Sequence, residues 1–393
     1  MRLQLLTAGS RGDVEPFAAL ARAAQDRGHE VRLGLPDHSD VDVSGLDTAS
    51  LGVDFARLIA EQGVSPFAAF RGMRAVMRTL LVTAVRQTLE YVPDLVVAHP
   101  KVLSAPLAAR RLGIPHVMAA PTPVVTPTRA FPAPGVLPFS IGPLNRATYV
   151  AAAAGSRMFA AELADAARTA GVEPVRRMPE ADATLIPISE HLVPRPPDWP
   201  ANVQLTGPWI GRRIAAPDPE VEAFIAGGPF LYAGLGSMAA GDPVARASTI
   251  VRAARDAGLR VLVATGWGGL VLPAASAGSD VLAVRTVDHA AVLPHAHVAL
   301  HHGGAGTVHA VARAGVPSVV VPFLADQPFW AGVLHRRGIA PPAIRPRRLT
   351  TARLHHALGE AGAMRDAAAT VGREMAGEDG TGRALGLLEA LVR

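Results

Sequence analysis

Residues 3–35 read LQLLTAGSRGDVEPFAALARAAQDRGHEVRLGL, and this stretch decides the fold class. Its apolar start, residues 3–7, predicts a β-strand, and apolar side chains then recur at helical spacing over residues 14–24. Gly28 ends the predicted helix, and the apolar residues 31–35 predict a second strand. A strand, a helix and a strand in this order form a βαβ unit, which indicates an α/β protein with a parallel sheet.

The composition excludes several classes of protein. The 393 residues are 49% hydrophobic and 18% charged, so the chain is long and apolar enough for about two to three folded domains. It contains no cysteine, which excludes disulfides, thiolate metal sites and a cysteine nucleophile. A net charge of +5, with interleaved arginines and 5% aromatic residues, argues against a nucleic-acid partner. Because we find neither a long apolar run nor a signal-peptide cleavage site, we expect a cytoplasmic protein without integral membrane association.

A helix–glycine–strand pattern recurs along the chain, which indicates two similar domains. Segments 108–120, 257–261 and 311–321 each carry a helical end, a glycine and an apolar run. The proline-rich stretch 193–219 marks a boundary. We therefore expect two doubly wound, Rossmann-like domains at residues 1–205 and 229–381, joined by a linker at 206–228.

The strongest local motif is His301-His302-Gly303-Gly304-Ala305-Gly306-Thr307, which directly follows the apolar residues 298–300 and precedes a predicted helix. Small residues at a strand-to-helix turn let backbone N–H groups approach an anion, and the helix N-terminus supplies a positive partial charge. His302 and Thr307 can add hydrogen bonds. The motif therefore predicts a cradle for a diphosphate. The alternative is a glycine turn with a packed histidine.

Two other patterns point away from metal and nicotinamide chemistry. Six histidines between His289 and His309 have no carboxylate at ligand spacing beside them, and Asp40 and Asp42 fit a solvated loop better than a metal site. The run 234–239 partly matches the dinucleotide fingerprint, but the acid expected at the end of the next strand is missing. That run therefore predicts only a small-residue turn, in which Ser237 faces the same cleft as His302.

Asp13 and Asp326 are the candidate carboxylates. Asp13 lies in the loop Ser10-Arg11-Gly12-Asp13 after the first strand, at the sheet edge where α/β proteins expose reactive groups. It is either a reactive group or the N-cap of the first helix, and the local sequence favours neither. Asp326 and Gln327 follow another predicted strand and are either exposed loop residues or groups that bond hydroxyls.

Together, these motifs resemble those of the inverting nucleotide-sugar glycosyltransferases of the GT-B fold. The most similar branch is that of the bacterial antibiotic glycosyltransferases, typified by those that glycosylate vancomycin-type glycopeptides. Residues 10–16 are similar to its N-terminal motif, and residues 232–238, 301–307 and 325–328 to its C-terminal motifs. The resemblance implies an N-terminal acceptor-binding domain and a C-terminal nucleotide-sugar-binding domain facing a cleft. It also implies a C-terminal helix, at about 382–393, that packs back on the first domain.

The resemblance further implies roles for individual residues. Asp13 would be the general base that deprotonates the acceptor hydroxyl, and Ser10 would orient it. Thr286 and Val287 would end a strand where family members hold the nucleotide base. The residues implied in donor binding are Gly12, Ser237, Val287, His302, Gly303, Gly304, Ala305, Gly306, Thr307, Asp326 and Gln327. No metal or cofactor is implied, because hydrogen bonds and the helix dipole would carry the diphosphate charge.

The implied reaction moves a sugar from a dTDP- or UDP-sugar to a hydroxyl of an apolar or aromatic natural-product aglycone, such as an antibiotic. The enzyme is expected to be a monomer or a dimer. The alternatives are a sterol or lipid glycosyltransferase of the same fold, a GT-B epimerase, and a non-catalytic nucleotide-sugar-binding helper subunit. The acceptor surface has no motif of its own. Phe70, Met73 and Met77, at helical spacing, are either acceptor-binding residues or ordinary core.

Overall fold

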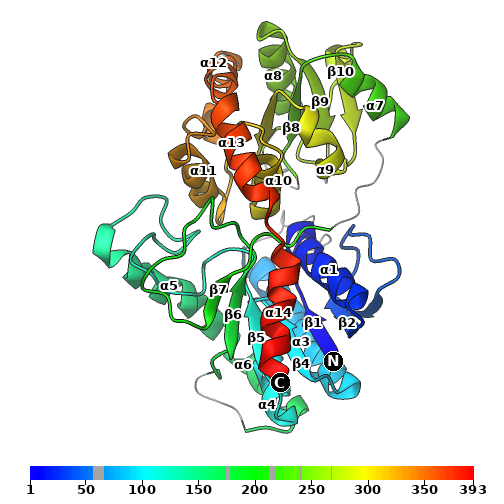
Figure 1. The fold of residues 1–393 in the computed structure, drawn as a ribbon, viewed down its shortest axis with the longest axis vertical. Helices are drawn as coiled ribbons and strands as arrows, with labels where there is room; N and C mark the ends of the chain where they lie inside the picture. The colour runs from blue at the N-terminus through cyan, green and yellow to red at the C-terminus, as the bar shows by residue number, and fades with distance from the viewer. Residues whose placement is uncertain (56–65, 174–177, 212–217, 237, 239–240, 267) are drawn as a thin grey trace. The chain divides into compact units, whose positions relative to one another are not determined.

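The computed structural model describes residues 1–55, 66–173, 178–211, 218–236, 238, 241–266 and 268–393, with the backbone alone for 66–71 and 155–156. The chain divides into two units, each built on one parallel sheet. The N-terminal unit comprises Met1–Glu190, Arg195–Arg212 and Asp379–Arg393, and the C-terminal unit comprises His191–Pro194 and Arg213–Glu378. The predicted pair of parallel α/β domains is therefore confirmed (Figure 1).

The N-terminal unit is built on a seven-stranded sheet in the order β3-β2-β1-β4-β5-β6-β7. All neighbours are parallel, and Leu3 of β1 pairs with Val31 of β2 on one side and Leu95 of β4 on the other. The chain thus builds one half of the sheet outward from β1 and then returns to build the other half from β4. The strands are β1 Arg2–Leu6, β2 Glu30–Leu35, β3 Asp47–Ser50, β4 Leu95–Ala98, β5 His116–Ala119, β6 Ala183–Ile186 and β7 Val203–Leu205.

Helices cover both faces of this sheet because successive strand residues point to opposite sides. Leu3 and Leu5 of β1 are buried with Phe17 and Leu385 of the helices α1 (Arg11–Asp26) and α14 (Gly380–Val392), which pack side by side (Figure 1). Leu6 is buried among residues of the other helices. These helices are α3 Pro66–Tyr91, α4 Ala105–Leu112 and α6 Ala160–Ala170, and the unit also contains the short helix η1 Gly142–Leu144 and the helix α5 Asn145–Arg157.

Local signals in the sequence set the ends of these helices. Ser10 has an extended backbone and is the N-cap of α1. α4 ends at Gly113, whose φ of +69° lies in the left-handed region that glycine adopts without strain, and β5 begins three residues later. The helix–glycine–strand pattern of the sequence is therefore a true boundary signal at this position.

The C-terminal unit has five parallel strands in the order β10-β9-β8-β11-β12. They are β8 Phe230–Gly234, β9 Arg260–Ala264, β10 Val281–Val284, β11 Val298–His301 and β12 Ser318–Val320. One face is covered by α8 Pro243–Asp256 and α12 Thr351–Gly362, and the other by α7 Pro219–Ala226, α9 His289–Val292 and α10 Ala305–Arg313. The remaining elements are α11 Gln327–Arg336, α13 Arg365–Ala376, and the short helices η2 Ala274–Ser276, η3 Leu293–His295 and η4 Pro346–Arg348.

Two boundaries differ from the sequence-based expectations. The expected linker 206–228 contains the helix α7, because Asp218 caps it and Val221 and Phe224 are buried in the core of the C-terminal unit. The strand expected to end at Val287 is β10, which already ends at Val284, so Val287 lies in the following loop. Among the described residues, no helix is long and apolar enough to cross a membrane.

Candidate active site

The N-terminal unit brings three polar side chains together at the point where its strand order reverses. β1 and β4 are neighbours, but β2 and β3 lie on the far side of β1, so the loops after β1 and β4 diverge to opposite faces. Open α/β sheets bind ligands in the crevice outside the carboxyl ends of such a pair of strands. Asp13 follows β1, and His99 and Lys101 follow β4.

Asp13 is the centre of this cluster. Its Oδ2 atom accepts hydrogen bonds from the Ser10 backbone N–H at 2.8 Å and from the Ser10 hydroxyl at 3.2 Å. The Lys101 ammonium lies 2.9 Å from the same oxygen, and His99 Nε2 lies 3.2 Å from Oδ1. Ser10, not Asp13, is the N-cap, and Asp13 is the third residue of α1. Asp13 therefore supports the start of the helix as the third residue of a capping box with Ser10, and not as the N-cap itself.

The charge state of the cluster follows from burial and from its two basic neighbours. Burial by itself raises the pKa of Asp13, but Lys101 and His99 outweigh it and hold the pKa well below its ordinary value. Burial lowers the pKa of His99, although the nearby Asp13 carboxylate acts in the opposite direction. Asp13 is therefore an ionised carboxylate at neutral pH, and its side chain is 20% exposed. It is available to a substrate that reaches the carboxyl edge of the sheet.

The second candidate site lies at the corresponding position of the C-terminal unit. The strand order reverses between β8 and β11, and the turn after each of these strands is rich in small residues. His301 closes β11 and is fully buried, with Nε2 3.0 Å from the Ser318 hydroxyl and Nδ1 accepting the Gly303 N–H at 3.1 Å. Burial lowers the pKa of His301 to about 3. His301 is thus a neutral group with both nitrogens engaged inside the protein.

His302, the next residue, is less buried than His301. Its ring lies between Gly236 and Gly304, where added Cβ atoms would come 3.4 Å from Cε1 and 2.5 Å from Nε2 of His302. Its Nδ1 atom is buried without a hydrogen-bond partner among the described residues. Burial lowers the pKa of His302 to about 4, so the free site holds a neutral imidazole. Glycine on both sides gives the ring the space that it occupies, and a hydrogen bond with the Gly234 backbone opposes the effect of burial on its pKa.

The turn after His302 presents the N-terminus of a helix. Gly303 has a φ of +90°, and a Cβ there would also lie 3.0 Å from Val320, so only glycine fits. Gly304 is the N-cap of α10, and Ala305, Gly306 and Thr307 form its first turn. Around Gly306 a Cβ would meet nothing within 4 Å. The first turn of α10 is therefore open, and its unpaired N–H groups suit an anion.

Asp326 and Gln327 begin α11 after β12. The Trp330 indole N–H donates to Asp326 Oδ2 at 2.9 Å, and Trp330 itself is fully buried. Gln327 Oε1 accepts the backbone N–H groups of Phe323 and Leu324 at 2.7 and 3.1 Å. Gln327 therefore shapes the loop that carries Asp326, while Asp326 keeps a half-exposed position with one oxygen held by Trp330.

The positions of the other predicted site residues say less about their roles. Gly12 is exposed in the first turn of α1, and Val287 is half-buried against the core of the C-terminal unit. Ser237 and the side chain of Phe70 lie outside the described residues. Met77 is 7% exposed and packs with Leu80 and Leu81, which fits the core alternative, and Met73 is half-buried against the same cluster.

A divalent metal has no ready-made site in the described parts of the chain. No group of three or more histidine or acidic side chains with metal-binding geometry occurs there. Asp42, a rejected candidate ligand, accepts hydrogen bonds from the Ser44 N–H and hydroxyl and pairs with Arg22 at 3.4 Å. The solvated-loop interpretation fits these contacts.

Sequence analysis missed His99, Lys101 and Trp330. The signal for the first two was present, because His99-Pro100-Lys101 directly follows the apolar run Leu95–Ala98. Asking which polar residues follow every buried strand, instead of the first one alone, would have found them. Trp330 carries no comparable signal, since a tryptophan in a helix is an ordinary core residue.

Comparison with known proteins identifies the family. Residues 3–119 match the glycosyltransferase family 28 N-terminal domain, and residues 274–390 match the erythromycin biosynthesis protein CIII-like, C-terminal domain. The chain is 34% identical over 425 residues to O-mycaminosyltylonolide 6-deoxyallosyltransferase of Streptomyces fradiae, covering 99% of this chain and 97% of the relative. It is also 34% identical over 355 residues to glycosyltransferase GtfE of Amycolatopsis orientalis, covering 86% of this chain and 85% of the relative.

Solved structures of glycosyltransferases share the fold of this chain. The solved structure of the glycosyltransferase VinC in complex with dTDP matches with a TM-score of 0.71 at 22% identity, over 100% of this chain and 99% of that chain. The resemblance read from the motifs is thereby confirmed across the whole chain. The protein belongs to the GT-B nucleotide-sugar glycosyltransferases, in the branch that contains the antibiotic glycosyltransferases.

Proposed function

We propose that this enzyme is an inverting, metal-independent glycosyltransferase that moves a sugar from a dTDP- or UDP-sugar to a hydroxyl of a natural-product aglycone. The observation that carries the proposal is Asp13, an ionised and partly exposed carboxylate at the switch point of the N-terminal sheet. A carboxylate held in this way can take a proton from a bound hydroxyl.

In the proposed reaction, Asp13 takes the proton of the acceptor hydroxyl. The hydroxyl oxygen forms a bond to the anomeric carbon from the side opposite the diphosphate. The bond between that carbon and the diphosphate oxygen breaks, and the nucleoside diphosphate leaves with the electron pair. A single displacement of this kind inverts the configuration of the sugar.

The diphosphate is assigned to the turn after β11. The first turn of α10 offers backbone N–H groups and a positive partial charge, and His302 Nδ1, which has no partner among the described residues, would donate to the diphosphate once the ring is protonated. These groups would take over the charge stabilisation that a divalent metal gives other glycosyltransferases. Asp326 is assigned to the sugar hydroxyls, because Trp330 fixes one carboxylate oxygen and leaves the residue half-exposed. The complex of VinC with dTDP favours thymidine over uridine.

The acceptor surface is assigned to residues 136–150 of the N-terminal unit instead of Met77. Large apolar side chains there are solvent-exposed, with Phe139 at 60%, Leu144 at 67% and Val150 at 69%. Exposed apolar side chains gathered on one segment are typical of a binding surface for an apolar partner. The first relative acts, by its name, on O-mycaminosyltylonolide, which is consistent with a large natural-product acceptor.

The direct test is to incubate the protein with dTDP- and UDP-sugars, with and without a panel of natural-product aglycones, and to analyse the products. We expect acceptor-dependent release of nucleoside diphosphate and a glycoside whose anomeric configuration is opposite to that of the donor. Tight donor binding without turnover would instead support the helper subunit. Conversion of the donor without any acceptor would support an epimerase.

A further inference from the structure

The two oxygens of the Asp13 carboxylate have different surroundings. Oδ2 receives three donors, which are the Ser10 N–H at 2.8 Å, the Ser10 hydroxyl at 3.2 Å and the Lys101 ammonium at 2.9 Å. Among the described residues, the polar contact of Oδ1 is with His99 Nε2 at 3.2 Å. Each carboxylate oxygen offers about two lone-pair directions, so Oδ2 is saturated and Oδ1 keeps room for one more hydrogen.

The protonation of His99 follows from its other nitrogen. The backbone N–H of Lys101 donates to His99 Nδ1 at 3.1 Å, so Nδ1 is an acceptor and carries no proton. Burial also keeps the ring neutral by lowering its pKa. The ring proton is therefore on Nε2, from which it points to Asp13 Oδ1. One loop after β4 thus supplies both a donor to Oδ1 and a cation to Oδ2.

We propose that Lys101 and His99 are positioning residues for Asp13, and that the acceptor's proton is taken by Oδ1 while Lys101 and Ser10 hold Oδ2. This inference rests on the proposed function, in which Asp13 is the general base. In the step, the O–H bond of the acceptor breaks and its proton bonds to Oδ1. The acceptor oxygen bonds to the anomeric carbon, and the electron pair of the broken carbon–oxygen bond leaves on the diphosphate. Lys101 and His99 keep their own protons throughout.

This arrangement also sets the strength of the base. An opposite charge within hydrogen-bond distance lowers the pKa of a carboxylate by about 1–3 units. Lys101 and His99 are the charged or titratable neighbours of Asp13. The other ion pairs of α1, and of α14 packed against it, do not involve Asp13: Arg11 pairs with Glu15 at 3.4 Å, Arg22 with Asp42 at 3.4 Å, and Glu389 with Arg27 and with His29. Lys101 is therefore the group whose removal should change Asp13 most.

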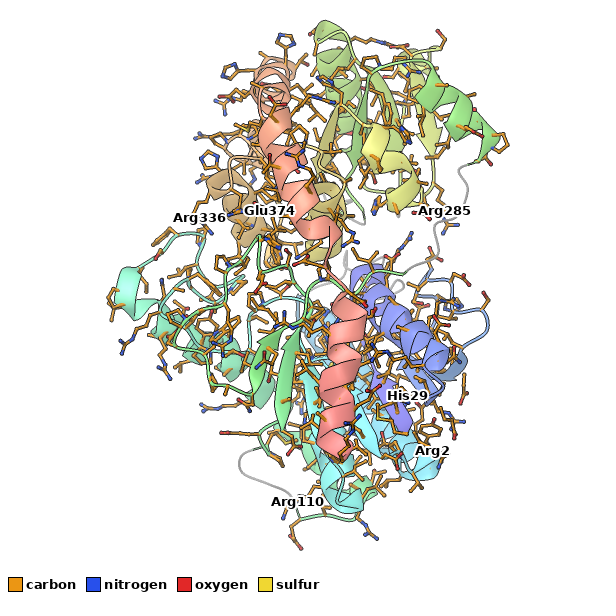
Figure 2. All side chains as sticks on the ribbon, in the orientation of Figure 1. Arg2, His29, Arg110, Arg285, Arg336 and Glu374 are labelled. Carbon is orange, nitrogen blue, oxygen red and sulfur yellow. The ribbon has the colours of Figure 1, made fainter. Side chains whose placement is uncertain are left out.

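The experiment compares Lys101→Met, which removes the ammonium but keeps an unbranched stem, with Lys101→Arg, which keeps a cation. Arg110→Met is the matched control, because Arg110, labelled in Figure 2, is an exposed cation in the last turn of α4, whereas the groups that act on the Asp13 carboxyl are Lys101 and His99. For each protein, the pH profile of kcat/KM is measured, and the Asp13 carboxyl is followed by NMR titration of carbon-13 aspartate-labelled protein. The labelled Asp13→Asn variant identifies the Asp13 signal.

In Lys101→Met, we expect the acidic limb of the profile and the NMR midpoint of Asp13 to move up together by about 1–3 pH units. In Lys101→Arg and Arg110→Met, the acidic limb of the kcat/KM profile should lie at the same pH as in the parent enzyme. An Asp13 midpoint that is the same in Lys101→Met and the parent would overturn the inference. A different result would contradict the proposed function. If the Asp13→Asn enzyme is fully active, Asp13 is not the general base, whatever the NMR midpoint of Asp13 is in the Lys101 variants.

A second pair of variants tests His99. His99→Gln keeps an N–H donor that can reach Oδ1, whereas His99→Leu removes it. We expect His99→Leu to lower kcat by about 10- to 100-fold with the donor Kd unchanged, and His99→Gln to recover part of the loss. Thermal midpoints separate this effect from misfolding of the buried site. Equal kcat values in folded His99→Leu and parent enzyme would contradict the assignment of Oδ1.

Discussion

Replacing His302 by Gln or Ala tests the proposed diphosphate site. In the free protein, burial holds the pKa of His302 at about 4, although a hydrogen bond with the Gly234 backbone acts in the opposite direction, so the ring is neutral and gains a second N–H for a phosphate oxygen only on protonation. A hydrogen bond to a charged partner contributes about 1.5–3 kcal/mol, which corresponds to a roughly 10- to 150-fold weaker Kd for dTDP in His302→Ala. Gly304→Ala should weaken binding as well, because its Cβ would lie 2.5 Å from His302 Nε2 and displace the ring.

The affinity for dTDP should also depend on pH, in a direction that follows from the pKa of His302. A bound diphosphate favours the charged imidazole, so the pKa of His302 is higher in the complex than in the free protein, where it is about 4. The complex therefore takes up a proton, and the affinity rises as the pH falls through the pKa of the bound state. Each unit of difference between the two pKa values is worth about 1.4 kcal/mol. The terminal phosphate of dTDP also titrates, but it does so in the same way when dTDP binds to His302→Gln. The difference between the two proteins therefore removes its contribution.

Isothermal titration calorimetry with dTDP between pH 5 and 8 is the assay, and the difference between the parent and His302→Gln isolates the contribution of His302. Gly359→Ala in α12 is the control for glycine replacement, because its Cβ would meet nothing within 4 Å. If both His302→Ala and Gly304→Ala bind dTDP like the parent, the diphosphate does not lie at this turn.

Three further predictions concern packing, the sugar site and metals. Met77→Gln should lower the free energy of unfolding by about 2–4 kcal/mol in urea titrations, because Met77 is 7% exposed in the core. If Met77 instead contacts the acceptor, the substitution should raise the KM for the acceptor at unchanged stability. Trp330→Phe keeps most of the buried ring but removes the N–H that donates to Asp326. The KM for the nucleotide sugar or kcat should therefore worsen about 3- to 10-fold, with a small change in thermal midpoint. An unchanged selectivity for the nucleotide sugar would argue against Asp326 as a sugar ligand. Activity should persist in excess EDTA, and loss that manganese restores would contradict metal-independent charge stabilisation.

Local patterns predicted the elements well because they depend on neighbours in the sequence. The strand at residues 3–7, the helix after it and the turn at His301–Thr307 all follow from periodicity and small residues. The same patterns could not decide whether Asp13 is a reactive group or the N-cap of the first helix, because an aspartate at the start of a helix suits both roles. Composition misled at the linker, where prolines hid a helix that Asp218 caps and Phe224 anchors.

The cluster around Asp13 depends on information that periodicity does not contain. Lys101 is 88 residues from Asp13 in sequence, and they meet only because β1 and β4 are neighbours in the sheet. A βαβ pattern predicts that strands are parallel but does not say which of them are adjacent. Met77 shows the same limit, because helical apolar spacing is identical for a side chain in the core and for one that faces a ligand.

Asp13→Asn tests the central claim most directly, because asparagine keeps the shape of the side chain and an oxygen that can accept the Ser10 N–H. The lost ion pair involves a Lys101 side chain that is 47% exposed, so the variant should stay folded. The measurement is kcat/KM for sugar transfer, with the thermal midpoint recorded beside it. We expect a stable protein whose kcat/KM is lower by about 10²- to 10⁴-fold, the usual contribution of a general base. Full activity in a stable Asp13→Asn protein would contradict it.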